Sequence, residues 1–498
     1  MTVETPKLLI PLIITLVAPF LVMVLGKEQN LRESVSFAAS ALTALVVLSF
    51  APMVLSGQIP HYTLFTLLPG VTVSFCMDGL SFLFAFIAPF LWIFATSYNI
   101  GYMRSLKEHA QTRYYTCFSV AIFGAVGVAT AANVFTLYLF YEIISVFTYP
   151  LVFHHQDEEG FMGGRKYLVY LMGTSKLFLL PAMVLTYCLA GTLDFPLGSW
   201  TQGIFPPEVV AAHPNLVRLT YVLFICGLAK AAIMPFHNWL PSAMVAPTPV
   251  SALLHAVAVV KAGVFSVSRI ILSGFGGTTM TDLGLSIPTA YAAAFTIVMA
   301  SFIALTKDDI KARLAYSTVS QLSYVVIGVA LVTPMAVQGG LMHIGHHAFS
   351  KITLFFGAGA IYVASHLKSI KKLNGLGRRM PWTFGAFGLA SLSMIGMPPV
   401  CGFVSKWYLV NGVLSLTDPQ FILFVALLLS TALNAGYFVP IFYRAFFLKP
   451  EPGTDLSQYK EAPLSMVVPL VFTSAVSVAL GLFPWIFQDF IKAFGGFK

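Results

Sequence analysis

Charge is scarce in this 498-residue chain: Asp, Glu, Lys and Arg make up 9% of it, against about 25% in soluble proteins. Hydrophobic residues make up 58%. The longest connections between apolar stretches, near 57–78 and 191–216, are short and leave no room for a soluble domain. This composition excludes an ordinary soluble protein and indicates a polytopic membrane protein.

Cysteine is also scarce. The five cysteines are scattered through apolar runs and form no CxxC pair. Iron–sulfur clusters and structural zinc sites use closely spaced cysteines, so we expect these residues to be small buried hydrophobic side chains. We predict no cofactor and no metal on this chain. The run from Leu8 to Gly26 also lacks a small-residue cleavage site, so we expect a membrane span there and not a signal peptide.

Apolar stretches of about 20 residues, each long enough to cross a bilayer, recur along the chain. We predict an all-α integral membrane protein with 14 transmembrane helices. Helices 1–3 are expected within residues 1–112, helices 4–8 within 113–273, helices 9–13 within 285–446 and helix 14 within 447–498. The expected spans are 6–26, 33–56, 79–103, 114–131, 133–153, 167–190, 217–240, 247–273, 285–305, 312–332, 338–365, 383–412, 420–446 and 463–488.

Basic residues predict the orientation. If the N-terminus faces outward, 18 of the 28 Lys and Arg residues lie in inner loops, and five are deep in spans. This bias follows the positive-inside rule and predicts both termini outside, in the cytoplasmic (inner) membrane of a bacterium or archaeon. No arginine is expected at depth. The outer side is left with Lys7, Arg218, Arg269, Lys492 and Lys498.

Two expected helices, the seventh and the twelfth, contain prolines that break a helix. The first contains Pro235 and the second contains Pro398 and Pro399. They are five helices apart, so they cross the membrane in opposite directions. Interrupted helices in matching places are typical of inverted repeats, and we predict two five-helix repeats, helices 4–8 and 9–13.

Six ionisable residues lie deep in the spans. Glu142 is near the middle of the fifth, where a charge needs a partner or water. We predict a pair with Lys230, which would act as a proton-transfer gate, because burial favours neutral lysine and a carboxylate favours the ammonium. A purely structural salt bridge is the alternative. The other deep lysines are Lys176, which either reaches Glu142 or extends to the interface, Lys261, Lys351 and Lys406.

Histidines accompany the lysines. His343, His347 and Lys351 are spaced four residues apart on the eleventh helix, so they share one face. Imidazoles beside a lysine predict a proton relay, which His255 could border, whereas His346 lies off this face. The alternatives are a polar seam without transport, or haem ligation with His255 or His237 as second ligand.

Two inner loops allow two interpretations each. His154, His155, Asp157, Glu158 and Glu159 are close in sequence and suggest a solvated loop or, as the less favoured alternative, a metal site. The mixed-charge run from Lys307 to Arg313 suggests a loop that sets topology or, less favoured, a site of proton uptake.

Taken together, these segments resemble the antiporter-like subunit superfamily. That superfamily contains proton-channel subunits of respiratory complex I, A- and D-type subunits of multi-subunit Mrp cation/proton antiporters, and subunits of membrane-bound hydrogenases. The chain is most similar to a D-type Mrp subunit or its hydrogenase-associated relative. The motifs that carry the resemblance, besides the helix-five glutamate, are AKAAIMPFHNWLPSA, LLHAVAVVKAGV, KARLAYSTVSQLSY, HHAFSKITLFFGAG and GMPPVCGFVSKW.

The resemblance implies roles for individual residues. Glu142 is similar to the family's essential glutamate, Lys230 to its lysine partner and Lys261 to the bridging lysine near His255. His347 and Lys351 match the relay on the eleventh helix. Lys406 matches the terminal lysine of the broken twelfth helix, a position at which one complex I subunit type has glutamate. Lys176 has no place in the shared pattern.

The implied function is a proton-translocating subunit of a multi-subunit membrane complex. Its partners would be other membrane subunits, protons and the lipid bilayer, and nucleic acid is not expected. Whether sodium is exchanged stays open, and no redox site is expected on the chain. The alternatives are a stand-alone cation or solute/proton transporter, a haem- or quinone-reactive subunit, and a scaffold in which the charges only pack helices.

Overall fold

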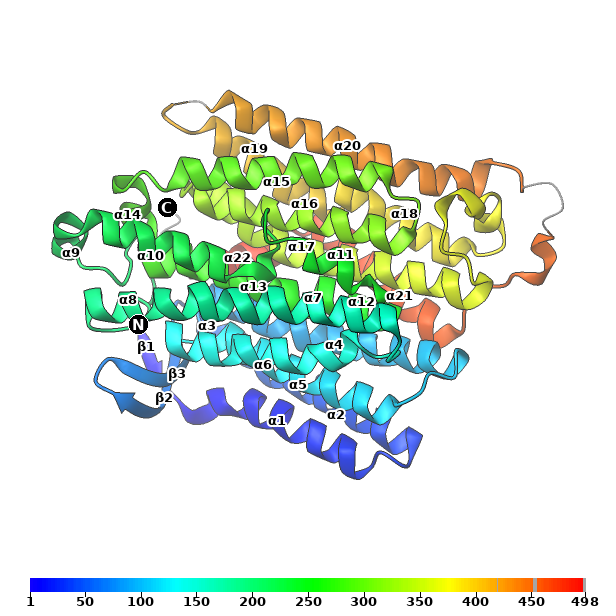
Figure 1. Ribbon diagram of the computed structural model, residues 1–498, viewed down its shortest axis with the longest axis horizontal. Helices are drawn as coiled ribbons and strands as arrows, with labels where there is room; N and C mark the ends of the chain where they lie inside the picture. Colours follow the sequence, from blue (N-terminus) through cyan, green and yellow to red (C-terminus); the bar gives the residue numbers. More distant parts are fainter. Residues whose placement is uncertain (419, 451–454, 496–498) are drawn as a thin grey trace.

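A computed structural model describes residues 1–418, 420–450 and 455–495, so Lys498 and part of the 447–498 region lie outside the described residues. Figure 1 shows long helices running side by side along the molecule. Ten helical runs among the described residues are long and apolar enough to cross a membrane. Helices also lie over the other four predicted spans, which contain many polar residues or a proline break.

The N-terminal part combines helices with a small sheet. Short 3-10 or π segments are labelled η. The elements are β1 (Thr2–Glu4), η1 (Pro6–Leu8), α1 (Leu9–Val24), α2 (Gln29–Leu48), α3 (Ala51–Leu55), β2 (Ile59–Leu68), β3 (Val71–Cys76) and α4 (Gly79–Ser105).

The region of the predicted first repeat contains several short segments between its long helices. They are α5 (Gln111–Thr130), α6 (Val134–Val152), α7 (Glu158–Thr174), η2 (Ser175–Leu179), α8 (Leu180–Ala190), α9 (Pro207–Ala212), α10 (Pro214–Gly227), η3 (Ala229–Ala231), α11 (Trp239–Ser242), η4 (Ala243–Val245), α12 (Thr248–Ala252), η5 (Leu253–Val257), α13 (Val259–Arg269), η6 (Ile270–Phe275) and α14 (Gly276–Asp282).

The second half has longer uninterrupted helices. They are α15 (Ser286–Thr306), α16 (Ile310–Ala330), α17 (Pro334–Ser365), η7 (Ile370–Leu373), η8 (Leu376–Arg378), α18 (Pro381–Ile395), α19 (Cys401–Leu414), α20 (Phe421–Phe447), η9 (Leu456–Gln458), α21 (Leu464–Leu482) and α22 (Trp485–Ala493).

The sheet departs from the expected all-helical chain. β2 pairs with β3 in an antiparallel hairpin and with β1 in parallel. Gly70, with a φ of +77°, lies between β2 and β3, a conformation that glycine adopts without steric cost. Residues 57–78 were expected to be a simple connection, but they form the strands β2 and β3. The strands were missed because they are short and lie between two strongly apolar helices.

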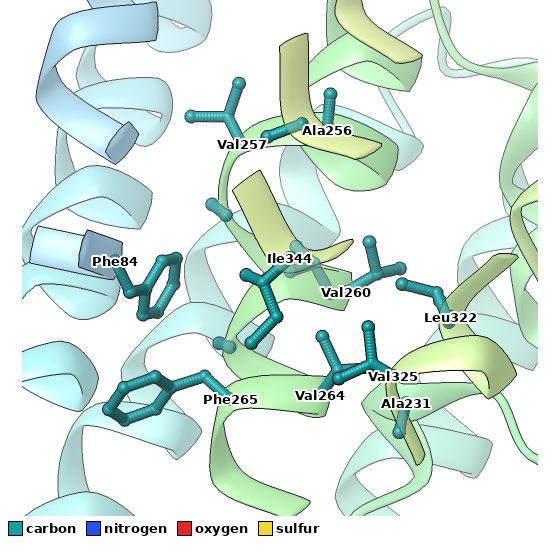
Figure 2. Close-up of a cluster of buried hydrophobic side chains, with 14 of the residues drawn as sticks. Phe84, Ala231, Ala256, Val257, Val260, Val264, Phe265, Leu322, Val325 and Ile344 are labelled. Carbon is teal, nitrogen blue, oxygen red and sulfur yellow. The ribbon is translucent and has the colours of Figure 1, made fainter. Parts of the chain in front are cut away.

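The core is built around α17. This helix packs against α4, α16, α18, α19 and α21 and against the run from α12 to η5. The most apolar window of the helical run from α12 to α14 is wholly buried. Figure 2 shows its apolar side chains Val260, Val264 and Phe265 among Phe84 of α4, Ile344 of α17, and Leu322 and Val325 of α16. The deep polar residues therefore lie on helices that are otherwise packed like a hydrophobic core.

The two proline-containing stretches are non-helical at their prolines. α10 ends at Gly227, and α11 begins at Trp239, beyond Pro235. α18 ends at Ile395, and α19 begins at Cys401, beyond Pro398 and Pro399. A broken helix leaves carbonyl groups without intrahelical partners, which gives buried ammonium groups something to bind.

Candidate functional site

Glu142 forms an ion pair, but its partner is Lys176. The Lys176 Nζ lies 3.0 Å from Glu142 Oε2 and donates a 2.7 Å hydrogen bond to the hydroxyl of Tyr138. Neither carboxylate oxygen accepts a hydrogen bond of normal geometry among the described residues. The Lys176 side chain is 47% exposed, whereas that of Glu142 is 13% exposed.

The predicted partner, Lys230, is fully buried in η3 and binds the neighbouring face of α6. Its Nζ donates to the carbonyl of Tyr141 at 2.9 Å and to Ser145 Oγ at 2.7 Å, and it lies 3.1 Å from the centre of the Tyr141 ring. Within the described chain it has no acidic ion-pair partner. The predicted Glu142–Lys230 salt bridge is therefore wrong for this structure.

The geometry of α6 explains the exchange of partners. Successive residues of an α-helix point about 100° apart, while residues four apart share a face. Tyr138 and Glu142 share the face that meets η2, and Tyr141 and Ser145 share the face that meets η3. Both lysines contact α6, but only Lys176 meets the face carrying the carboxylate.

Lys261 of α13 joins the two halves of the chain. Its Nζ lies 2.7 Å from Nδ1 of His347 on α17, and both side chains are fully buried. Gly263, two residues along α13, lets this helix approach the break that holds Lys230: a Cβ there would lie 2.3 Å from the carbonyl carbon of Lys230. The close approach brings Lys230 and Lys261 onto adjacent backbone segments.

The three residues predicted to share a face of α17 have different partners. His343 lies 2.9 Å from Ser405 Oγ and 3.0 Å from Gln321 Oε1. His347 is next to Lys261, and the centres of the two histidine rings are 6.1 Å apart. Lys351 donates a 2.9 Å hydrogen bond to Ser317 Oγ.

Lys406 binds the end of the preceding half-helix. Its Nζ donates to the carbonyls of Met394 and Ile395, at 2.7 and 3.1 Å, and lies 4.6 Å from the centre of the Tyr324 ring. The negative end of the α18 dipole favours a cation there. Gly396 makes room for this side chain, because a Cβ at its position would lie 2.7 Å from Lys406 Cδ.

The carbonyl of Met394 connects most of the second-half residues. Besides the Lys406 bond, it accepts hydrogen bonds from Gln321 Nε2 at 3.3 Å and Asn434 Nδ2 at 3.2 Å. Gln321 continues to His343. Asn434 Oδ1 accepts a hydrogen bond from the hydroxyl of Tyr437, and the oxygen of that hydroxyl lies 3.1 Å from Ser317 Oγ, the partner of Lys351. Lys351, His343 and Lys406 thus belong to one hydrogen-bonded network.

Sequence reasoning missed this network and a buried ion pair. Gln321, Asn434, Ser317 and Tyr437 are neutral, so the search for deep charges passes over them. Arg269 was placed on the outer side, yet it is fully buried: Nη1 and Nη2 donate to Asp78 at 2.6 and 2.9 Å. The helix continues beyond residue 273 to Asp282, which leaves Arg269 inside the protein. Asp78 is the N-cap residue of α4, so Arg269 is buried inside the protein at the start of that helix, and the expectation of no arginine deep in a span stays a prediction.

Two predicted histidines lie apart from these contacts. His255 lies in the π segment η5, its ring centre 4.7 Å from that of Phe355. His346 stacks near Phe487, with ring centres 5.7 Å apart. Neither ring makes a hydrogen bond in the part of the chain that the structure describes.

The sequence of residues 131–432 matches the family described as NADH:quinone oxidoreductase/Mrp antiporter, transmembrane region. The chain belongs to this family. It is 30% identical over 508 aligned residues to the NADH-quinone oxidoreductase subunit N of Desulforudis audaxviator, covering 97% of this chain and 96% of that one. The family predicted from the sequence motifs is thereby confirmed.

A longer relative and a solved structure agree with this assignment. The chain is 28% identical to the A-type subunit of the Na⁺/H⁺ antiporter of Alkalihalophilus pseudofirmus, over 83% of its own length and 53% of that protein. Its fold is similar to a chain of the Mrp complex from Dietzia sp. DQ12-45-1b, with a TM-score of 0.85 at 20% identity, covering 98% and 97% of the two chains. The family member is thus a membrane protein related to subunits of multi-subunit complexes.

Proposed function

We propose that this family member is a proton-translocating subunit of a multi-subunit complex in the cytoplasmic membrane of a bacterium or archaeon. It would cross the membrane 14 times, with inverted repeats over 113–273 and 285–446 and both termini outside. The pairing of β1 with β2 and the contact of α22 with the start of α4 at Gly79 support termini on one side. The two proline breaks support the repeats.

Protons would pass from Lys230 to Lys261, through His347 and His343, and on to Lys351 and Lys406. The observation that carries this proposal is the 2.7 Å contact between Lys261 Nζ and His347 Nδ1, because it links a lysine of one half to the network of the other. Lysine and histidine both release and accept protons. Water would bridge the steps between groups that are not in direct contact.

Glu142 would control the start of this path. It pairs with Lys176, yet it is also close enough to act electrostatically on Lys230. Movement of the carboxylate toward Lys230 would hold a proton there, and its return to Lys176 would release that proton toward Lys261. Each charge moved through the membrane works against about 2.3 kcal/mol per 100 mV, which is comparable to the free energy of a buried ion pair.

The energy source would lie on partner subunits. The names of the relatives offer two hosts: a quinone oxidoreductase, in which a redox reaction drives the protons, and a cation/proton antiporter, in which sodium is exchanged. In either case the chain itself supplies the proton path.

A double-mutant experiment tests the link between the halves. The host complex carrying Lys261→Ala, His347→Ala or both is reconstituted in vesicles, and proton transport is followed with a pH-sensitive dye. Each single variant should lower transport by about 100-fold, the scale of a lost proton-transfer group. Because the residues act in series, the double variant should be no slower than either. Exposed Lys7→Ala is the control; wild-type transport by both single variants would refute the path.

A further inference from the structure

Four side chains of metal-ligand type meet on two loops outside the proton path. Glu108 and His109 lie between α4 and α5, and His154 and His155 lie between α6 and α7. One ligand atom each from Glu108, His109 and His154 lies within 4.8 Å of the other two. Glu108 Oε2 is 3.7 Å from His154 Nε2 and 3.8 Å from His155 Nδ1. These four residues are called the four-ligand cluster below.

His154 is the fixed member of this cluster. It is fully buried, and neither ring nitrogen makes a hydrogen bond of normal geometry within the described residues, although the His109 backbone is nearby. A buried polar group without a partner is uncommon and needs a physical explanation. Arg113 donates a 2.9 Å hydrogen bond to the carbonyl of His154, which holds the loop in place. One of these nitrogens, Nε2, lies 3.7 Å from Glu108 Oε2, which is too far for a hydrogen bond but close to the spacing of two ligands of one metal ion.

Two of the donor separations are close to those of a tetrahedral site. Zinc–nitrogen and zinc–oxygen bonds of about 2.0–2.2 Å place tetrahedral donors about 3.3–3.6 Å apart. Glu108 Oε2 is within about 0.5 Å of that separation from both His154 and His155. His109 and His155 are exposed and Glu108 is half-buried, so these three can rotate toward the buried His154.

We propose that the four-ligand cluster binds one divalent transition-metal ion of the zinc type, through three imidazoles and one carboxylate. Imidazole with carboxylate is a ligand set that suits zinc, with copper and nickel as competitors. The bound ion would tie the α4–α5 loop to the α6–α7 loop.

The four-ligand cluster lies at the edge of a polar pocket. Glu108 and His155 line a polar pocket of about 560 Å³ together with Glu159, Asp309, Lys311 and Lys368. Glu159 and Asp309 offset the positive charges of Lys311 and Lys368 in this pocket. The ion would lie on the rim of this pocket, at the end of the molecule that carries the basic loops.

Zinc binding to the purified full-length chain tests the proposal. Zinc sulfate is titrated against a chromophoric chelator, and cobalt is used separately to detect the absorption bands of a tetrahedral site. The wild-type chain should bind one ion. Because even outer-shell changes weaken metal sites by about 10–100-fold, His109→Ala and Glu108→Gln should each weaken binding by more than about tenfold. Both residues lie on an accessible loop, so these variants should fold.

His154→Ala should abolish binding, and its thermal unfolding without metal shows whether the chain remains folded. Exposed His213→Ala, far along the chain, is the matched control and should bind like wild type. The proposal is overturned if the wild-type chain binds no zinc, or if His109→Ala and Glu108→Gln bind as tightly as wild type.

Discussion

The buried lysines of the first and second halves of the chain have different kinds of binding partner. In the first half the carboxylate of Glu142 pairs with Lys176 and acts electrostatically on Lys230, which itself binds a carbonyl and a hydroxyl. In the second half Lys351 and Lys406 bind only neutral oxygens among the described residues. The interaction energy of an ion pair changes strongly when its two groups move apart. In a hydrogen-bonded network of neutral groups, a proton can move while the electrostatic field of the surrounding side chains changes little. The first half is thus suited to control and the second to conduction.

Removal of Glu142, the acid at the start of the proposed proton path, should have the largest effect. Glu142→Gln leaves Lys176 and Lys230 without a nearby negative charge, and an unpaired charge in a membrane costs several kcal/mol. We expect proton transport in reconstituted vesicles to fall by about 100-fold, since 1.36 kcal/mol corresponds to a factor of ten. Glu158→Gln, in an exposed first turn of α7, is the control. Unchanged transport by Glu142→Gln would contradict a controlling first half.

A carboxylate introduced in the second half should give its lysine an acidic neighbour, as Glu142 does in the first half. Gln321 lies between His343 and the carbonyl that binds Lys406. Gln321→Glu adds a negative charge, which favours the protonated forms of the histidine and the lysine beside it. Proton release should slow, and transport should fall by about tenfold in the same vesicle measurement. Gln58→Glu adds the same charge at an exposed position and should have no effect; equal rates for both variants would argue against conduction through neutral groups.

A methyl group at Gly396 tests how tightly the second half holds its last lysine. Gly396 has a φ of +93°, and a Cβ would lie 2.7 Å from Lys406 Cδ. Gly396→Ala should lower the free energy of unfolding by about 1–3 kcal/mol and displace Lys406. Thermal unfolding in detergent measures the loss of stability. Gly385→Ala in the same helix α18 meets open space and should be neutral or slightly stabilising.

The smallest effect is expected for Lys176→Ala. Because this side chain is half-exposed, its ion pair resembles an exposed one, which contributes about 0–1 kcal/mol. Glu142 would keep its electrostatic influence on Lys230, so transport should fall by less than about fivefold. A loss as large as that of Glu142→Gln would show that Lys176, and not Lys230, is the partner that matters.

Local sequence patterns predicted where the chain is apolar and where its helices break. Helices lie over all the predicted spans in the described residues, because span length and apolar composition are local properties. The pairing of β1 with β2 was missed because it joins Thr2–Glu4 to residues near 60, which are far away in the sequence. The long-range pairing of Asp78 with Arg269 was missed for the same reason.

The order of residues is enough to establish the membrane class, the family and most of the ionisable residues inside the helices. Which of these residues meet depends on how the helices pack. Glu142 contacts Lys176 and not Lys230, Lys261 contacts His347, and Lys406 binds the end of α18. Rotation about the helix axis explains the difference. Successive side chains of an α-helix point about 100° apart. The neighbour that each one reaches therefore depends on which other helix packs against that side, and this helix can be far away in the sequence.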